Sequence, residues 1–421
     1  MQKMKHSGVE WIGEIPEDWE ITTYRRLLNR RKEYDDQDKQ VLSLTIQGVK
    51  VKNENYGKMA EDFTGHQIVK QGDLVFTPRD FDATPILSGI APCDGCISNL
   101  YFVLYPHNIS ETFIPFINYF MWGVKWGGDI WKRLSYGMRF SYNFQQFGAL
   151  PIAVPPIDTQ RRIADFLDDK CGKIDRYIEK QQQIIDKLKE YKQAVITETV
   201  TKGLDPDVPM KDSGIEWIGM IPEHWDIPEI KYLVRIASGG TPDRNHPEYW
   251  NGNIPWIKTG ELQNDIITNA EEYITEEGLN NSSAQVFNIN TILVAMYGQG
   301  KTRGMTALLK TPASTNQACA GLTVTNSNVQ IEYLWQCLIG AYDAIRSEAA
   351  GSGQPNLSAT LIGSFHIALP PIEEQGLIVE YIKDRTVEIK STIHKAEKLL
   401  EKLTEYKKSL IYEAVTGKME V

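Results

Sequence analysis

The sequence predicts an α+β protein with two mixed α/β domains, separated by an antiparallel two-helix coiled coil and related by an internal pseudo-two-fold repeat. Three observations support this fold class: two collinear duplicated segments, two long stretches with heptad spacing, and two dissimilar middle segments rich in glycine, aromatic and β-branched residues. The predicted boundaries are residues 1–157 for the first domain, 158–202 for the first helix, 203–372 for the second domain and 373–421 for the second helix.

Two pairs of matching segments define the internal repeat. SGVEWIGEIPEDWEITTYRRL begins at position 7 and SGIEWIGMIPEHWDIPEIKYL at position 213, an offset of 206 residues. PPIDTQRRIADFL begins at position 155 and PPIEEQGLIVEYI at position 370, an offset of 215 residues, which also relates EYKQAVITETVT at 190 to EYKKSLIYEAVT at 405. Because both pairs occur in the same order, we infer one duplicated unit with a constant head, a variable middle and a constant tail.

The constant tails predict two long helices. Residues 158–201 contain no proline and only one glycine, Gly172, and their apolar or small residues alternate three and four apart, which is heptad spacing. Each helix of about 44 residues would be about 65 Å long. Such a helix with one narrow apolar stripe needs a partner, and two-fold symmetry favours an antiparallel pair over packing of each helix on separate surroundings. The predicted seam residues are Leu167, Cys171, Ile174, Ile178, Ile185, Leu188, Val195 and Thr199, interrupted by Gln181 and Lys192, and in the second copy Ile382, Thr386, Ile389, Ile393, Leu400, Leu403, Leu410 and Ala414, interrupted by Ala396 and Lys407.

The variable middles, roughly 28–150 and 234–365, predict irregular α/β domains. Short runs of β-branched and aromatic residues bounded by Gly, Asn and Pro predict strands. Two apolar runs predict helices at 114–122 and 331–347. The predicted strands are Val41–Ile46, Asp73–Thr77, Leu100–Tyr105, Thr291–Ala295 and Gly321–Thr325.

The composition excludes several classes of protein. Hydrophobic residues at 42% and charged residues at 24% exclude a disordered chain, a collagen-like fibre and a disulfide-knotted miniprotein. No apolar run approaches the roughly 20 residues that span a bilayer, the chain starts without an apolar signal segment, and five irregularly spaced cysteines suit a reducing compartment. We therefore expect a cytoplasmic protein. Since the net charge is −10, any nucleic-acid binding depends on local basic patches or on partners.

Several motifs resemble those of the specificity (S) subunits of type I DNA restriction–modification enzymes. They include the repeated SGIEWIG-IPEHW head, the PPIEEQ helix start and the EYKKSLIYEAVTGK ending. The second middle adds SGGTPDRNHPEYWNGNIPWIKTGEL (238–262) and TNQACAGL (315–322), and the first middle matches more loosely through QGDLVF (71–76) and GCISNLYFVLYP (95–106). The resemblance extends over essentially the whole chain.

The resemblance implies a non-catalytic, sequence-specific DNA-binding subunit. Two target recognition domains would read the two halves of a split, asymmetric site in double-stranded DNA, and the helix pair would set the unspecified gap between the halves. Two methyltransferase (modification) subunits would methylate adenine with S-adenosylmethionine, and restriction/translocase subunits would use ATP and magnesium. The chain itself is expected to hold no cofactor and no metal.

The densest polar loop of the second middle is YGQGKTRG, residues 297–304. It places Gln299, Lys301, Thr302 and Arg303 between two predicted strands. Arg and Lys pair with guanine and Gln with adenine in the major groove, and glycines let the backbone approach the DNA. The alternative interpretation is a solvated hairpin tip. Two further glycine-containing segments contribute the candidate DNA-binding residues Thr241, Arg244, Ser352 and Gln354, for which a structural turn is the alternative.

The first middle offers three candidate DNA-binding residues in predicted loops, Arg79, Arg139 and Ser141. Residues 136–142 precede the constant tail, in the place that residues 351–356 take in the second copy. A local basic run would contact phosphates, which gives affinity without sequence choice, or would form a solvated helix face. This run consists of Arg25, Arg26, Arg30, Arg31 and Lys32.

Other patterns suggest different chemistry. AMYGQGKT (295–302) fits a relaxed phosphate-loop pattern, but the RGMT that follows has little helix propensity, so an enzyme using a nucleotide at Lys301 is only an alternative. Cys93-x-x-Cys96 is one half of a zinc pattern, and small buried thiols explain it more simply.

A second alternative function is that of a coiled-coil adaptor that binds only protein. Tryptophans in the constant heads could stack on bases, but their position favours packing: Trp11, Trp19, Trp217 and Trp225.

Overall fold

The computed structural model describes residues 3–34, 40–52, 65–81, 85–135, 137, 140–298, 300–351 and 356–421. Arg139, Gln299, Ser352 and Gln354 lie outside the described residues. The chain forms two compact units. The first unit comprises Met1–Gln183 with Glu397–Val421, and the second comprises Ile184–Ala396.

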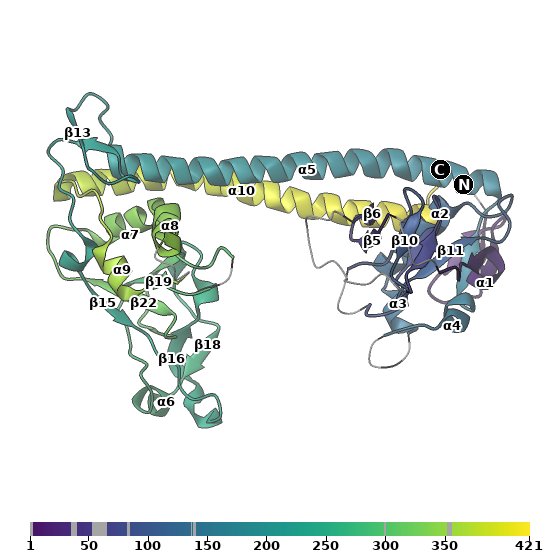
Figure 1. Ribbon diagram of the computed structural model, residues 1–421, viewed down its shortest axis with the longest axis horizontal. Helices are drawn as coiled ribbons and strands as arrows, with labels where there is room; N and C mark the ends of the chain where they lie inside the picture. The colour runs from purple at the N-terminus through teal and green to yellow at the C-terminus, as the bar shows by residue number, and fades with distance from the viewer. Residues whose placement is uncertain are drawn as a thin grey trace. The chain divides into compact units, whose positions relative to one another are not determined.

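The first unit contains a four-stranded antiparallel sheet in the order β4-β11-β8-β9, of which β11 is labelled in Figure 1. A hairpin of β5 and β6 and a pair of β7 and β10 form a second small layer, and β3 pairs with β12. The strands are β3 (Glu20–Thr23), β4 (Leu28–Arg30), β5 (Leu42–Thr45), β6 (Gly48–Val51), β7 (Gln67–Val69), β8 (Leu74–Phe76), β9 (Ser88–Ile90), β10 (Gly95–Ile97), β11 (Phe102–Pro106) and β12 (Pro151–Val154). The short helices are α1 (Tyr24–Leu27), α2 (Ile114–Trp126), α3 (Ile130–Arg133) and α4 (Phe144–Gly148).

The second unit contains a five-stranded sheet in the order β15-β22-β19-β20-β17 and a three-stranded sheet in the order β18-β16-β21. The strands are β15 (Val234–Ser238), β16 (Trp250–Ile257), β17 (Asp265–Ile267), β18 (Glu272–Ile274), β19 (Ile292–Ala295), β20 (Thr306–Leu309), β21 (Ser314–Thr315) and β22 (Cys319–Val324). The helices are α6 (Glu276–Asn280), α7 (Ile331–Gly340), α8 (Tyr342–Gly351) and α9 (Ala359–Ser364), with 3-10 turns η1 (Ile230–Tyr232), η2 (Pro247–Tyr249) and η3 (Thr259–Glu261).

The two middle segments share a four-stranded core of the same topology although their sequences show little resemblance. The order β4-β11-β8-β9 corresponds to β15-β22-β19-β20, and in both units a helix, α2 or α7, follows the strand at the second position of the sheet. The duplication is therefore visible in the fold of these four strands and the helix that follows, while the other strands of the two middles are paired differently. The matching registers are Leu28 with Pro106 and Val234 with Val324, and Leu74 with Leu104 and Ile292 with Leu322.

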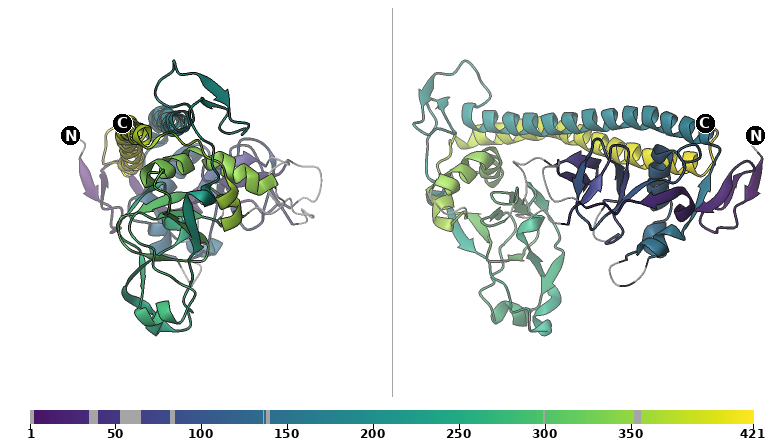
Figure 2. Two further views of the ribbon diagram at one scale, coloured as in Figure 1. Left: turned by 90° about the vertical axis from the view of Figure 1, so that its left-hand side faces the viewer. Right: turned by 45° about the vertical axis from the view of Figure 1, so that its right-hand side comes forward.

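The constant heads form two equivalent hairpins. β1 (Met4–His6) pairs with β2 (Glu14–Pro16), and β13 (Met210–Asp212) pairs with β14 (Met220–Pro222), in the same register. Figure 2 shows the first hairpin beside the C-terminal end of the chain, where Gly417 lies against Pro16 and Trp19. Trp19 and Trp225 are 2% and 0% exposed, so the prediction that these tryptophans pack rather than stack on bases is confirmed for them.

The predicted long helices are α5 (Ile157–Lys202) and α10 (Ile372–Val415). In the first unit the beginning of α5 packs against the end of α10, and in the second unit the end of α5 packs against the beginning of α10, so the pairing is antiparallel in each. Every predicted seam residue is buried or half-buried, which confirms the heptad seam.

One predicted helix is wrong in detail. Residues 331–347 were expected to form a single helix, but α7 ends at Gly340 and α8 begins at Tyr342. The carbonyl oxygens of Ile339 and Gly340 accept hydrogen bonds from the Gln193 side chain on α5, at 2.7 and 3.1 Å, and Thr197 Oγ1 also donates to Gly340. These bonds satisfy carbonyls that a helix end leaves without an intrahelical partner.

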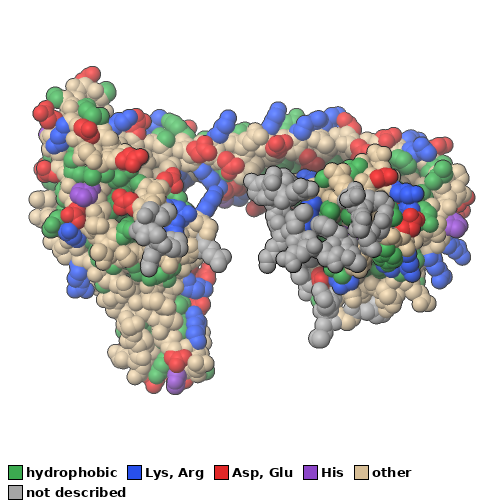
Figure 3. Space-filling view, in the orientation of Figure 1, with side chains coloured by type: hydrophobic (Ala, Val, Ile, Leu, Met, Phe, Trp, Pro, Cys, Tyr) green, Lys and Arg blue, Asp and Glu red, His purple; other side chains and the backbone are tan. Residues whose placement is uncertain are grey.

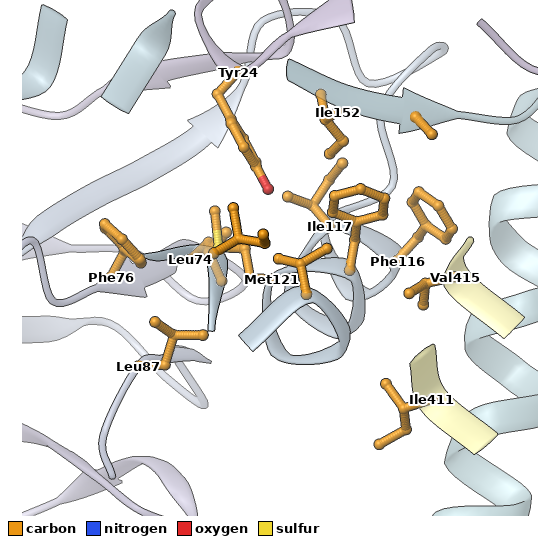
Figure 4. Close-up of a cluster of buried hydrophobic side chains, with 14 of the residues drawn as sticks. Tyr24, Leu74, Phe76, Leu87, Phe116, Ile117, Met121, Ile152, Ile411 and Val415 are labelled. Carbon is orange, nitrogen blue, oxygen red and sulfur yellow. The ribbon is translucent and has the colours of Figure 1, made fainter. Parts of the chain in front are cut away.

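Each domain attaches to the helix pair through a glycine. A Cβ atom on Gly123 of α2 would lie 2.7 Å from Val415 Cγ2 of α10, and one on Gly340 of α7 would lie 3.1 Å from Val200 Cγ2 of α5. Val200 and Val415 are equivalent in the repeat. Figure 4 shows this core in the first unit, with side chains of α2 between the sheet and the end of α10.

A fully buried glutamine fixes the start of each long helix. The Gln160 side chain accepts a hydrogen bond from the Phe113 N–H (2.9 Å) and donates to the carbonyls of Glu111 (2.8 Å) and Pro155 (2.9 Å). Its repeat equivalent Gln375 accepts from the Gln330 N–H and donates to Asn328 and Pro370. In both units this one side chain ties the helix start to the segment that precedes α2 or α7.

The repeat predicts opposite effects of one substitution at two equivalent seam positions. Lys407 makes an ion pair with Asp175 at 2.6 Å. Its equivalent Lys192 has a lowered pKa, because burial and then the charge of Lys390 outweigh the attraction of Asp265, which pairs with Lys390 at 3.7 Å. Lys407→Gln is expected to lower the free energy of unfolding by about 0.5–1 kcal/mol, and Lys192→Gln to raise it by a similar amount at neutral pH.

The pH dependence of stability provides a control for the comparison of Lys192→Gln with Lys407→Gln. Because the folded pKa of Lys192 lies below its unfolded value, the penalty is complete below the folded pKa and is relieved as the pH rises toward 10.5. The advantage of Lys192→Gln in thermal melts should therefore shrink in this alkaline range. Equal effects of the two substitutions would contradict the assignment.

Candidate nucleic-acid interface

The first unit contains a pocket of about 520 Å³ at the C-terminal end of β8. The end of β4, the turn after β8, the turn before β11 and the N-terminus of α4 together form its wall. The lining residues are Arg30, Pro78, Arg79, Asn99, Leu100, Phe102, Ser141, Tyr142, Asn143, Phe144 and Gln146. Two of the predicted site residues, Arg79 and Ser141, are thus brought together across 62 residues of sequence, from position 79 to position 141.

Two arginines give the pocket its charge. The Arg30 guanidinium lies 4.5 Å from the Phe102 ring centre and 5.8 Å from that of Phe144, so the two rings hold it in place. Its buried Nε donates to no described residue, and Arg79 makes no ion pair within the described part of the chain. Because the Arg30 Nε is buried, the NH₂ groups of Arg30 and the guanidinium of Arg79 are the cationic donors of the pocket, beside the amides of Asn99, Asn143 and Gln146.

The predicted basic run is not one helix face. Arg25 and Arg26 are exposed on α1, but the chain then enters β4, and Arg31 is bonded to Asp73 at 2.8 Å with only 10% of its side chain exposed. The hydrogen bond to Asp73 is the main cause that raises the pKa of Arg31. Arg31 is consequently structural, and Arg30 belongs to the pocket.

In the second unit the predicted loop joins β19 to β20, as a hairpin connection. Tyr342 OH of α8 donates to the Lys301 carbonyl at 2.6 Å, and the Arg346 guanidinium donates to the carbonyls of Gly300 and Arg303. These bonds hold the loop backbone while the side chain of Lys301 stays exposed and that of Thr302 half-exposed. Because strand β20 follows the loop, it does not open a helix as a phosphate loop requires.

Thr241 and Arg244 have structural contacts. The Thr241 hydroxyl donates to Gln317 Oε1, and the Arg244 guanidinium bonds Glu272 at 2.7 Å while it lies 3.6 Å from the Trp250 ring centre. The hydrogen bond from Arg244 is the main cause that lowers the pKa of Glu272. The contacts favour the structural-turn alternative for Arg244, whose side chain is nonetheless 54% exposed.

A second pocket, also of about 520 Å³, lies in the second unit at the start of the loop that joins β19 to β20. Sequence reasoning did not single out its central polar residue, Gln317, although it belongs to the TNQACAGL motif. Asn99 of the first pocket was missed in the same way, because a lone amide in a turn carries no pattern. The lining residues are Ser238, Met296, Tyr297, Gln317, Ala318, Ser358 and Ala359.

Two further properties of the described residues bear on ligand binding: their surface charge and their possible metal ligands. On the face of the second unit in Figure 3, Lys and Arg side chains lie among Asp and Glu, in keeping with the net charge of −10. Within the described residues no three His, Cys, Asp or Glu side chains are grouped as metal ligands; Cys96 is buried in β10, and Cys93 Sγ lies 3.6 Å from Gln40 Oε1. None of the described helices is long and apolar enough to cross a membrane.

The comparisons with known proteins agree with this architecture. Residues 222–402 match the family described as Type I restriction modification DNA specificity domain. A Methanocaldococcus jannaschii type I restriction enzyme specificity subunit is 31% identical over 44% of this chain and 43% of its own length, and an Escherichia coli one is 31% identical over 41% and 45%. Those alignments thus span less than half of either relative, whereas a third, putative M. jannaschii specificity subunit aligns over 97% of this chain and 96% of its own length at 25% identity.

A solved structure extends the likeness in fold to almost the whole chain. A chain from a structure described as the structural basis of complex assembly and conformational transition of the type I R-M system covers 96% of this chain and 99% of that one, with a TM-score of 0.69 and 13% identity. At 13% identity this likeness concerns the fold of the chain, including its repeated frame. Residues 222–402 are thus similar to a type I restriction modification DNA specificity domain, and the three relatives named above are type I restriction enzyme specificity subunits, one of them putative.

Proposed function

We propose that this chain selects the DNA target of a type I restriction–modification complex. Each unit reads one half of a bipartite, asymmetric double-stranded DNA site, and the paired helices α5 and α10 set the gap between the halves. Two methyltransferase subunits and the restriction/translocase subunits assemble on this chain and supply S-adenosylmethionine, ATP and magnesium. The chain binds none of these cofactors itself and acts in the cytoplasm.

One observation supports this proposal above the others: two domains with the same four-stranded core present different polar side chains at corresponding places. Fold and frame are shared through the repeat, as Gln160 and Gln375 illustrate, while Arg79 corresponds in the sheet register to Tyr297. A protein-only adaptor would have no need for two different polar surfaces on equal frames. Two different half-sites do require them.

The proposed DNA-binding residues remain those named above in both units. Lys301, Thr302 and Arg303 lie on a loop that α8 holds, and Arg79 and Ser141 line the first pocket. The further candidates are Thr241 and Arg244, with Arg139, Gln299, Ser352 and Gln354 outside the described residues.

Sequencing of methylated adenine in cells with and without this chain tests the proposal. We expect a single two-part motif with unequal halves and a fixed gap, present only when this chain is expressed with its modification partner. An unchanged methylation pattern in the presence of an assembled complex would support the protein-only adaptor instead.

Arg303→Ala gives a residue-level prediction. If Arg303 contacts a base, the substitution should cost about 1–3 kcal/mol of binding free energy and relax one position of a single half-site. Binding of the assembled complex to a set of oligonucleotides, each with one base pair changed, measures this effect. A uniform loss on every sequence would make Arg303 a phosphate contact.

A further inference from the structure

The two pockets occupy the same position in the two units. In the first unit the Tyr142 N–H donates to the Pro78 carbonyl at 2.8 Å, and in the second the Leu357 N–H donates to the Met296 carbonyl at 3.0 Å. The next residue in each case, Asn143 or Ser358, caps the helix that borders the pocket, α4 or α9. Both pockets measure about 520 Å³, within the range of ligand sites in proteins, about 300–1,000 Å³.

The strand register aligns the lining residues one by one. Phe76 pairs with Phe102 in the first unit, and Val294 pairs with Ala320 in the second, so the residues that follow β8 and β19 correspond. Six of the seven residues that line the second pocket have a lining residue at the corresponding place in the first. The corresponding pairs are Pro78 and Met296, Arg79 and Tyr297, Asn99 and Gln317, Leu100 and Ala318, Asn143 and Ser358, and Phe144 and Ala359.

The shared position carries different chemistry in the two units. The first pocket is lined by two cations, Arg30 and Arg79, and by no carboxylate among its described lining residues. The second pocket has no charged side chain among its described lining residues, and the one amide among them is Gln317, whose oxygen accepts a hydrogen bond from Thr241. Two pockets at the same place in the fold, lined by different residues, are expected where two domains bind different ligands of the same class.

The rings of the first pocket also limit how its cations can bind. The ring centres of Phe102 and Phe144 lie 4.5 and 5.8 Å from the Arg30 guanidinium carbon, and the Nε of Arg30 is buried, so the two terminal NH₂ groups are the donors left to meet a ligand. A planar donor edge of this kind matches the two acceptors, O6 and N7, on the major-groove edge of guanine. The Gln317 NH₂ can donate to N7 of adenine, and its oxygen, which accepts from Thr241 with one lone pair, can accept from N6–H₂ with the other.

We propose that these paired pockets are the base-reading sites of the two units, that Arg79 and Arg30 select a guanine in one half-site, and that Gln317 selects an adenine in the other. This inference rests on the proposed function and names the residues through which each unit would choose its sequence. The exchange of Arg79 for Tyr297 and of Asn99 for Gln317 is then a main reason why the two halves of the target differ.

The experiment compares Arg79→Gln and Gln317→Ala with the wild-type chain, each assembled with its modification partners. Methylated-adenine sequencing first gives the wild-type motif, and binding to duplexes with single base-pair changes then measures each position. We expect Arg79→Gln to reduce discrimination about 10–100-fold at one guanine of one half-site only, and Gln317→Ala to do so at one adenine of the other half only.

Arg26→Gln is the matched control, since it removes an exposed cation of α1 that does not line the pocket. It should leave the preference for every base unchanged. Arg30→Lys, which keeps the charge but loses the planar edge, should relax the same guanine as Arg79→Gln. Melting curves confirm that each variant folds before its binding is compared.

Three results would overturn the inference while the proposed function stands: a wild-type half-site without guanine, an equal loss on all sequences for Arg79→Gln, or both variants acting on one half. If instead the wild-type complex directs methylation to no two-part motif, the proposed function itself fails.

Discussion

Gln160→Leu is expected to destabilise the first unit by about 3–5 kcal/mol, a large part of the stability of a typical domain. The substitution leaves three buried partners without a hydrogen bond, namely the Phe113 N–H and the carbonyls of Glu111 and Pro155. Each buried polar group that loses its partner costs about 1–3 kcal/mol. Denaturant unfolding of the full chain measures the total loss.

Hydrogen exchange locates the effect of Gln160→Leu. Protection should fall around α2 and the start of α5, while α7 in the second unit stays protected. Gln375→Leu should give the mirror result, because Gln375 makes the equivalent bonds. Gln181→Leu is the matched control: the same change on the same helix, at a half-buried seam position, should cost little or stabilise. A loss from Gln181→Leu as large as that from Gln160→Leu would contradict this account.

Lengthening both long helices is expected to change the target without changing its halves. Seven residues inserted after Gln183 in α5 and seven after Lys398 in α10 keep the heptad seam in register and add about 10.5 Å to the pair. At about 3.4 Å per base pair, the unspecified gap should grow by about three base pairs. Methylated-adenine sequencing reports both the halves and the gap.

Replacement of one heptad by another of equal length controls for altered helix sequence and should leave the gap unchanged. If the lengthened chain still assembles and folds but methylates the original motif, the helix pair does not set the spacing.

The repeated heads and long helices could be predicted from the sequence, because the duplicated segments are still similar enough to align. The heptad seam and the matching heads follow directly from spacing and identity, and the structure has both. The shared topology of the middles was not visible, since a sheet requires only apolar residues at buried positions and tolerates many sequences there. The single predicted helix at 331–347 failed because its break at Gly340 depends on Gln193 and Thr197, which are distant in sequence.

The candidate site was predictable only in part. Loops rich in glycine and polar residues pointed to Lys301 and Arg303, because composition marks such loops. Arg30 was placed in a basic run, and only the strand geometry that sets it against Phe102 and Phe144 assigns it to a pocket. The importance of Gln317 likewise depends on contacts with residues far away in the sequence.

The central claim is that two different variable segments, on the same repeated scaffold, each recognise one half-site. The most direct test is a chain that carries the same variable segment twice. Residues 28–150 correspond to residues 234–365 in the strand registers, so the first segment can replace the second between equivalent ends. The account predicts that a complex with this chain methylates an inverted repeat, with both halves equal to the half-site of the first unit. Methylation of the original asymmetric motif would contradict the assignment of one half-site to each unit.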